Sequence, residues 1–148
     1  MEQNKKSKVF FIIIILVLLI VLGVLGYFIY NVYNNNQTER EYKELSSSVS
    51  VTEKNSTEKK APKNPIDFKK LKKTNKEIFA WIKVPDTNID YPMLQSLKSD
   101  DYYLHRDIYG NNKYAGSIYI EYCNDTELYD RVTVAYGHNM QNGSMFAN

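Results

Sequence analysis

The sequence contains two histidines, His105 and His138, and one cysteine, Cys123, the residue types that most often act as proton carrier and thiol nucleophile near neutral pH. His138 lies in VTVAYGHNMQNGSMFAN, residues 132–148, which reads as a strand, a tight turn, a second polar turn and the first residues of a helix. Gly137 allows the chain to turn sharply at the end of the strand. A histidine on a polar loop at the rim of a sheet is a common position for a group that transfers protons. His138 is therefore the first candidate for a catalytic residue.

A histidine of this kind works beside a nucleophile, and the sequence offers Cys123. This cysteine ends the segment GSIYIEYC, and a single cysteine cannot form an intramolecular disulfide. A cysteine hydrolase built from Cys123 and His138 is one hypothesis. The interpretation that we favour is a cysteine at a strand end with no chemical role. Arg106 and Arg131, the two arginines after residue 64, are interpreted as surface charges.

A metal site formed by His105, Asp107 and His138 is disfavoured by the spacing of these residues. The segment HRD does not place two ligands on one face of a helix, and no carboxylate cluster flanks His138. The sequence therefore predicts no metal centre, and His105 is expected on a loop or at a helix end.

Residues 9–30, VFFIIIILVLLIVLGVLGYFIY, contain no charged residue and predict a membrane-spanning helix. At about 1.5 Å per residue they extend roughly 33 Å, which is enough to cross the hydrocarbon core of a bilayer. The apolar run is longer than that of a signal peptide, and no small-residue cleavage site follows it. Lys5, Lys6 and Lys8 in residues 1–8 indicate a cytoplasmic amino-terminal tail. We therefore expect a single-pass plasma-membrane protein whose carboxy-terminal region is extracytoplasmic.

Residues 31–64 are rich in Asn, Ser, Thr, Glu and Lys and contain few apolar side chains. Such a composition buries too little surface to offset the entropy of ordering. The segment is predicted to be a flexible extracytoplasmic linker, with a helical turn or two at TEREYKEL, residues 38–45. Positive and negative side chains are nearly equal in number, which gives a net charge of +2. The lysines of FKKLKK, residues 68–73, are interpreted as a solvated helix face. Binding of nucleic acid is not expected.

The folded region is expected to span residues 65–148. PIDFKKLKK has apolar residues at helical spacing, and TNKE, residues 74–77, fits a capping box that would begin a second helix. Four short segments, AWIKV, IDYPMLQ, GSIYIEY and RVTVAY, then read as strands, which are predicted to pair antiparallel. The expected fold class is mainly β, a barrel or sandwich with peripheral helices. Four strands are fewer than the roughly eight of a typical barrel, which indicates part of such a fold.

Several of these segments together resemble class B sortases, enzymes that anchor proteins to the cell surface of Gram-positive bacteria. YGHNMQNGSMF resembles the histidine loop of the family. Residues 67–96, DFKKLKKTNKEIFAWIKVPDTNIDYPMLQS, resemble its amino-terminal helices and first two strands, and YYL, GSIYIEY and VTVAYGHNM follow in the family order. The resemblance covers about residues 65–148, together with the anchor and the stalk. It implies a partial sortase-type β-barrel with N-terminal helices, preceded by a single transmembrane helix.

The resemblance also implies an activity, its partners and the roles of individual residues. Class B sortases are cysteine transpeptidases: a thiolate attacks the carbonyl after the threonine of an NPxTN-like sorting motif, and an amine of peptidoglycan or its lipid-linked precursor resolves the acyl-enzyme. No metal or organic cofactor is implied. By resemblance His138 is the catalytic histidine, and Leu104 and Tyr136 line the groove for the sorting-signal peptide. Asp100 stands where the family commonly has an asparagine, which puts one polar contact to the peptide in doubt.

The nucleophile of the family lies on a later strand in a TLxTC pattern, and its oxyanion-stabilising arginine lies on the strand after that. Residues 1–148 contain neither feature, and Cys123 precedes the histidine, which is the wrong order. We therefore expect residues 65–148 to be the N-terminal half of a sortase-like catalytic domain, truncated before these strands and inactive alone. The alternative hypothesis is a short membrane-anchored surface protein that binds a peptide or partner without catalysis.

Overall fold

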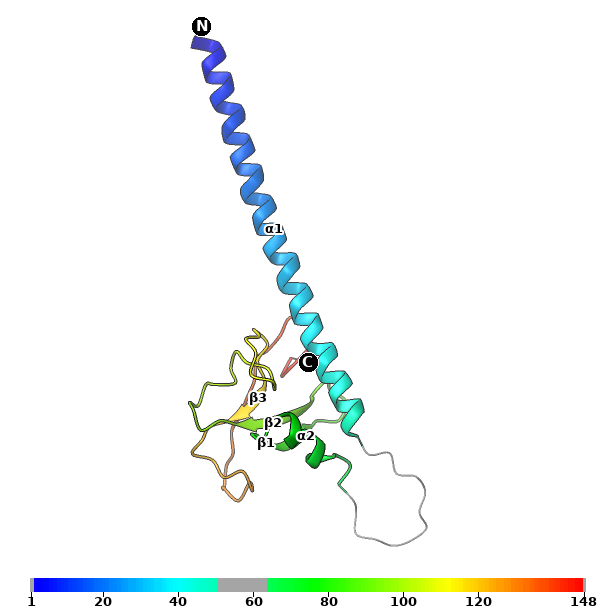
Figure 1. The fold of residues 1–148 in the computed structure, drawn as a ribbon. Helices are drawn as coiled ribbons and strands as arrows, with labels where there is room; N and C mark the ends of the chain where they lie inside the picture. Colours follow the sequence, from blue (N-terminus) through cyan, green and yellow to red (C-terminus); the bar gives the residue numbers. More distant parts are fainter. Residues whose placement is uncertain (1, 51–63, 148) are drawn as a thin grey trace. The chain divides into compact units, whose positions relative to one another are not determined.

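The computed structural model describes residues 2–50 and 64–147. The chain divides into two compact units, Met1–Asn34 and Asn35–Asn148. The described part of the first unit is entirely helical, and the second unit contains the sheet. The elements in chain order are α1 (Glu2–Val49), α2 (Phe68–Thr74), β1 (Ile78–Lys83), β2 (Asp90–Gln95), β3 (Ile118–Ile120) and β4 (Ala135–Tyr136) (Figure 1).

In the first unit, helix α1 carries the apolar run that the sequence placed at residues 9–30. The large apolar side chains of this run, from Phe10 onward, are exposed. The helix is long and apolar enough to cross a membrane, judged by its length and composition alone. The cytoplasmic position of the amino terminus stays a prediction.

Helix α1 continues through residues 31–49, where the sequence predicted a linker. Tyr42 and Val49 are buried there, Tyr42 with only 4% of its surface exposed, and Leu45 packs against the same core. Their spacing of three and four residues places the three side chains along one face of the helix. The prediction of a flexible linker is therefore wrong for the last turns of α1. The rest of the predicted linker, residues 51–63, lies outside the described residues.

The four strands form one sheet in the order β1-β2-β3-β4. The pairs β1–β2 and β3–β4 are antiparallel, but β2 and β3 are parallel, with Met93 opposite Ile118 and Gln95 opposite Ile120. The prediction of antiparallel pairing throughout is therefore wrong for the central pair. Parallel neighbours need a long connection, and residues 96–117 supply it. Within the described residues the strands form a four-stranded sheet, and the expected barrel is not confirmed.

The segment TNKE leads into a strand and does not begin the predicted helix. Asp67 caps α2, since its Oδ1 accepts a hydrogen bond from the Lys70 N–H at 3.1 Å, and α2 ends at Thr74. Asn75 then turns the chain, because its Oδ1 accepts a hydrogen bond from the Glu77 N–H at 2.9 Å. Strand β1 begins at the next residue. The turn made by the asparagine therefore outweighs the capping pattern.

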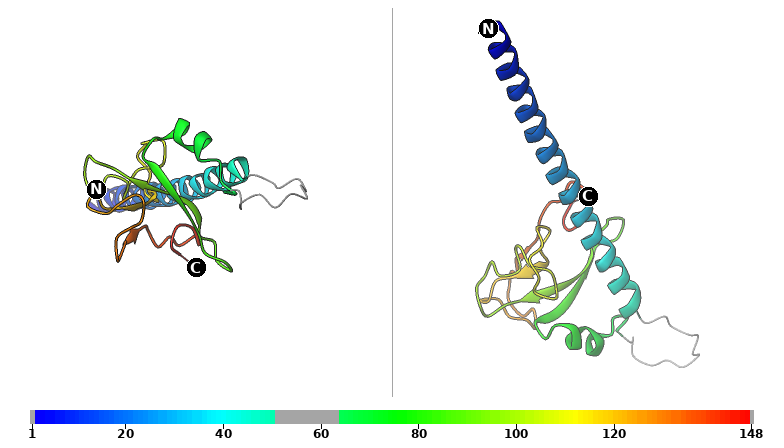
Figure 2. Two further views of the ribbon diagram at one scale, coloured as in Figure 1. Left: turned by 90° about the horizontal axis from the view of Figure 1, so that it is seen from below. Right: turned by 45° about the horizontal axis from the view of Figure 1, so that its top comes forward.

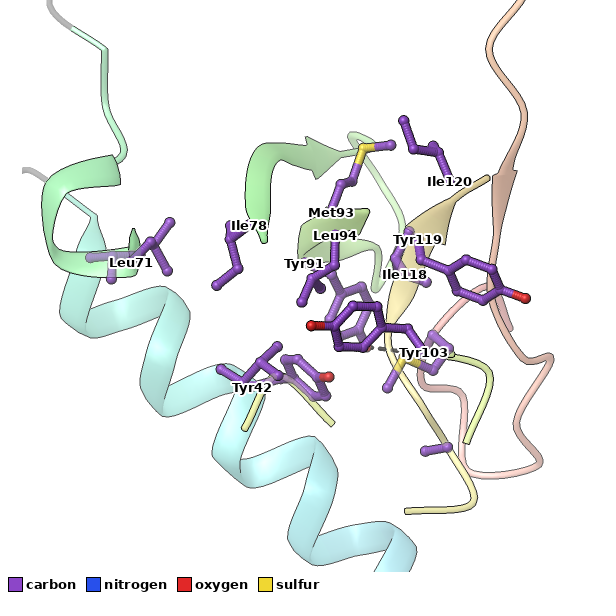
Figure 3. Packing of buried hydrophobic residues seen from close by; sticks show 14 of the residues in the cluster. Tyr42, Leu71, Ile78, Tyr91, Met93, Leu94, Tyr103, Ile118, Tyr119 and Ile120 are labelled. Atoms are coloured by element: carbon purple, nitrogen blue, oxygen red, sulfur yellow. Dashed lines mark hydrogen bonds between the residues drawn. The ribbon is translucent and has the colours of Figure 1, made fainter. Parts of the chain in front are cut away.

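The core of the second unit joins the sheet to α2, to the end of α1 and to the connection before β3. Figure 3 shows side chains from these elements pointing toward one another. The Tyr42 hydroxyl donates a hydrogen bond to the carbonyl of Gly116 at 3.1 Å, which ties α1 to that connection. The carboxy-terminal segment, red in Figure 2, lies beside α1, where Asn142 Nδ2 donates to Asn36 Oδ1 at 3.3 Å. The bulkiest fully buried side chains include Tyr103, Leu71, Ile78, Leu94, Ile108, Ile118 and Ile120.

Candidate active site

His138 follows strand β4 on a loop that is closed at its base. A Cβ on Gly137 would overlap the side chain of Ile118 and lie 3.1 Å from the ring of Phe146, so a glycine suits the end of this strand. The His138 carbonyl accepts a hydrogen bond from the Phe146 N–H at 3.0 Å. The loop that begins at His138 is therefore closed by a main-chain hydrogen bond from Phe146. The helix predicted after this loop is not present in the described residues up to 147.

The imidazole of His138 is half-buried and bonds to the main chain. Its Nε2 lies 2.9 Å from the carbonyl oxygen of Leu104. A carbonyl oxygen only accepts hydrogen bonds, so Nε2 carries a proton. In the neutral ring Nδ1 then holds the lone pair. The arrangement supports proton transfer at Nδ1, as a general base or, once protonated, as a general acid.

Two further rings lie against His138, and we call His105, Tyr114 and His138 the aromatic triad. The ring centroid of His138 lies 5.0 Å from that of Tyr114 and 5.1 Å from that of His105. His105 and Tyr114 are 5.9 Å apart. The three planes are inclined to one another by only 24° to 31°. These separations are typical of attractive aromatic pairs.

The structure brings Leu104 directly to His138, because the Leu104 carbonyl accepts the imidazole hydrogen bond. The Leu104 side chain is half-buried and packs against the core. Tyr136 lies two residues before His138, with its ring stacked on Tyr119 at a centroid distance of 5.6 Å. Its surface is 37% exposed. Both predicted groove residues therefore lie close to the histidine loop and are partly accessible, while their contact with a peptide stays a prediction.

A carboxylate stands beside the exposed tyrosine. The Tyr136 hydroxyl donates a hydrogen bond to Glu121 Oε1 at 3.1 Å. This bond raises the pKa of Tyr136, because the phenolate would face the Glu121 carboxylate. Tyr136 is therefore a neutral hydrogen-bonding group at physiological pH.

Asp100, the residue that departs from the family pattern, has a contact of its own. Its Oδ1 accepts a hydrogen bond from the main-chain N–H of Tyr122 at 2.8 Å. The Gln95 side chain donates to the carbonyls of Glu121 and Asn124 at 2.9 and 2.6 Å. These three bonds hold the segment after β3 beside the rim of the sheet. An acceptor oxygen at position 100 is sufficient for its bond, and both aspartate and asparagine supply one.

Cys123 lies in this segment and is exposed. Its Sγ donates a weak hydrogen bond to Glu121 Oε2 at 3.8 Å. Over residues 2–50 and 64–147, no group of three or more His, Cys, Asp and Glu side chains is arranged to hold a metal ion.

Reasoning from the sequence missed the aromatic triad. His105 and Tyr114 belong to the connection between β2 and β3, and the parallel pairing of these strands carries that connection across to β4. No periodicity in the sequence reports such a contact. The tyrosine and histidine types were visible, but their proximity to His138 depends on the topology.

The chain is similar to sortases of known sequence. It is 48% identical over 82 residues to sortase B of Listeria monocytogenes, a match that covers 55% of this chain and 33% of that protein. It is 35% identical over 79 residues to sortase B of Staphylococcus aureus, which covers 53% of this chain and 32% of that protein. The chain is homologous to class B sortases. It spans about a third of the length of these two sortases, and no protein-family profile matches it.

Solved sortase B structures share the fold of this chain. Sortase B from Bacillus anthracis, in complex with AAEK1, gives a TM-score of 0.62 at 37% identity, over 80% of this chain and 53% of that one. The Staphylococcus aureus sortase B–substrate complex gives a TM-score of 0.50 at 35% identity, over 53% of this chain and 36% of that one. The resemblance to class B sortases predicted from the histidine loop and the first strands is therefore confirmed.

Proposed function

We propose that residues 1–148 form the membrane anchor and the N-terminal half of the catalytic domain of a class B sortase. The complete enzyme would be a cysteine transpeptidase that attaches proteins bearing an NPxTN-like sorting motif to the cell wall. The observation that carries the proposal is the hydrogen bond from His138 Nε2 to Leu104 O, which places the lone pair of the neutral ring on Nδ1, in a chain homologous to sortase B.

In this proposal His138 moves protons between the nucleophile, the leaving group and the incoming amine. Leu104 and Tyr136 form part of the groove for the sorting-signal peptide, and an amine of peptidoglycan or its lipid-linked precursor accepts the acyl group. The peptide assignment is supported by the partial exposure of Tyr136 and by the substrate complex of the Staphylococcus aureus homologue. Residues 9–30 anchor the enzyme in the plasma membrane, with the amino terminus in the cytoplasm.

The thiolate and the oxyanion-stabilising arginine of the class have no counterpart in residues 1–148. The Cys123 thiol bonds to Glu121 Oε2, whereas His138 Nε2 bonds to the Leu104 carbonyl. A polypeptide of these residues alone is therefore expected to have no transpeptidase activity, because an imidazole without a thiolate cannot form the acyl-enzyme.

A chimera tests this proposal. Residues 1–147 are joined to the carboxy-terminal remainder of Listeria monocytogenes sortase B, and cleavage of an NPxTN-containing peptide is measured. We expect the chimera to cleave the peptide and the 148-residue chain to give no cleavage. In the chimera, His138→Ala is expected to lower kcat by about a hundredfold to ten-thousandfold. Lys72→Ala, on the exposed face of α2, is the matched control and should keep full activity. A chimera that folds, as judged by cooperative thermal unfolding, but does not cleave would contradict the proposal.

The second candidate is a membrane-anchored surface protein that binds a peptide or a partner without catalysis. The observation that favours it is the position of β1 and β4 at the two ends of the strand order, where an extended peptide can add as a further strand. Binding of the NPxTN peptide by the 148-residue chain, together with a folded but inactive chimera, would favour this candidate.

A further inference from the structure

The acceptor for the His138 proton is held by close main-chain packing. A Cβ on Gly116 would overlap the carbonyl oxygen of Leu104 and lie 2.6 Å from that of Tyr103. The Tyr103 carbonyl also accepts a hydrogen bond from the Ser117 N–H at 3.0 Å. The turn that presents the Leu104 carbonyl is therefore pressed against the chain just before β3. It offers His138 an acceptor with little freedom to move.

One hydrogen bond does not fix the plane of an imidazole. The ring can rotate about the line from Nε2 to the carbonyl oxygen, and the second side-chain torsion of histidine has a broad preference. The rings of Tyr114 and His105 restrict this rotation, because both lie about 5 Å from His138 and nearly parallel to it.

The burial of these two rings does not explain their arrangement. Tyr114 is 59% exposed, and His105 is also exposed. Exposed aromatic side chains gain little from the hydrophobic core, yet these two converge on one half-buried histidine. The Lys113 N–H donates to the His105 carbonyl at 3.0 Å, which brings the segments that carry the two rings together.

We propose that Tyr114 and His105 are positioning residues for His138, which hold its imidazole so that Nε2 donates to the Leu104 carbonyl and Nδ1 faces the reacting groups. The inference rests on the proposed function for the role of the proton. In the reaction Nδ1 accepts a proton from the attacking group, the ring becomes an imidazolium, and the same proton passes to the leaving group. The proton on Nε2 stays on the Leu104 hydrogen bond throughout.

The chain contains only two histidines, so their ring signals can be read separately by nuclear magnetic resonance. The full 148-residue chain is labelled with nitrogen-15 histidine in detergent micelles, and His105→Phe identifies the His138 signals. A hydrogen-bonded Nε2 proton exchanges slowly with water and is visible. We expect the signal of this proton in the spectra of the wild-type chain, of Tyr114→Phe and of His105→Phe. We expect the signal to disappear in Tyr114→Ala and in the double variant Tyr114→Ala/His105→Ala. Rescue by phenylalanine separates ring positioning from a role of the phenol.

Tyr109→Ala is the matched control, since Tyr109 is a 56% exposed tyrosine on the same connection and lies outside the triad. It should leave the Nε2 proton visible. Main-chain amide spectra check that each variant is folded. An unchanged Nε2 proton in folded Tyr114→Ala and in the folded double variant would overturn the inference.

The chimera supplies a second readout that separates this inference from the proposed function. Tyr114→Ala is expected to lower kcat by about tenfold to a hundredfold with little change in KM, and Tyr114→Phe to retain it. An active chimera whose kcat is insensitive to Tyr114→Ala overturns the positioning role and leaves the proposed function standing. A folded but inactive chimera contradicts the proposed function, and the resonance experiment then decides the positioning of the ring by itself.

Discussion

At the scale of single residues, Gly116 determines where the acceptor for His138 lies. Its φ is +59°, a conformation that glycine adopts at low cost, and a side chain there would also overlap the Leu104 carbonyl oxygen. We expect Gly116→Ala to lower the free energy of unfolding by about 1–3 kcal/mol and to displace this carbonyl. Urea denaturation measures the first effect, and the visibility of the His138 Nε2 proton measures the second.

Gly110→Ala is the control for this substitution. Gly110 has a φ of +84°, but a Cβ there would meet only the Tyr102 hydroxyl at 3.8 Å. This variant carries the main-chain strain without the overlap, so it should lose stability and keep the Nε2 proton. If both variants kept the proton, the tight packing at Gly116 would have no influence on the histidine.

Among the single residues of the site, the sequence was informative about His138 and silent about its neighbours. Gly137, His138 and the polar residues after them form a local pattern, so their turn could be predicted from residue types. The contact of His138 with the Leu104 carbonyl crosses 34 residues of sequence. It depends on main-chain atoms, which every residue type shares, and no residue type could have indicated it.

At the scale of elements, the last turns of α1 are part of the folded unit. The Tyr42 hydroxyl donates a hydrogen bond to the Gly116 carbonyl in the connection before β3, and Tyr91 on β2 donates to Glu39 Oε2 on α1 at 2.9 Å. The match to the Bacillus anthracis structure covers 80% of the chain, which is more than residues 65–148 alone. The last turns of α1 therefore pack against the sheet and contribute side chains to its hydrophobic core.

A comparison of two shortened proteins tests the role of this helix. A protein that begins at residue 35 is expected to unfold cooperatively, and one that begins at residue 65 to be less stable by about 3–5 kcal/mol or more. The loss of the buried Tyr42 ring alone has a cost of this size. In the longer protein, Tyr42→Ala should reproduce much of the loss, whereas Lys43→Ala, whose side chain is 71% exposed, should have little effect. Equal stability of the two shortened proteins would show that α1 is dispensable for the fold.

The strands could be predicted from the sequence, but the pairing of β2 with β3 and the burial of the last turns of α1 could not. Each predicted strand overlaps an observed one, because alternation and turn residues are local signals. The parallel pairing of β2 with β3 could not be predicted, since residues 96–117 return the chain without a helix or a strand that would mark a crossover. Tyr42, Leu45 and Val49 do have helical spacing, but three apolar residues in a polar stretch are too few to indicate burial without the sheet that covers them.

At the scale of the whole molecule, the second unit depends on tyrosines buried as neutral phenols. Tyr42, Tyr91 and Tyr103 come from α1, from β2 and from the connection before β3, and each is at most 4% exposed. Burial raises the pKa of all three, because the phenolate would lose its hydration. Tyr91 also accepts a hydrogen bond from the Met145 N–H at 3.1 Å, so its hydroxyl joins β2 to the histidine loop.

These raised pKa values predict that the unit becomes less stable in alkaline solution. An unfolded tyrosine loses its proton near pH 10, whereas the folded unit keeps these three protons to higher pH. The folded state then binds more protons than the unfolded state, so its stability is fully present below about pH 10 and falls as the pH rises beyond it. The slope is at most about 1.4 kcal/mol per pH unit for each tyrosine. Urea denaturation at several pH values above 9 measures this slope, with tyrosinate absorbance as a second signal. Tyr42→Phe removes one of the three protons and should make the slope shallower by up to that amount, and an unchanged slope would mean that Tyr42 does not contribute to alkaline unfolding.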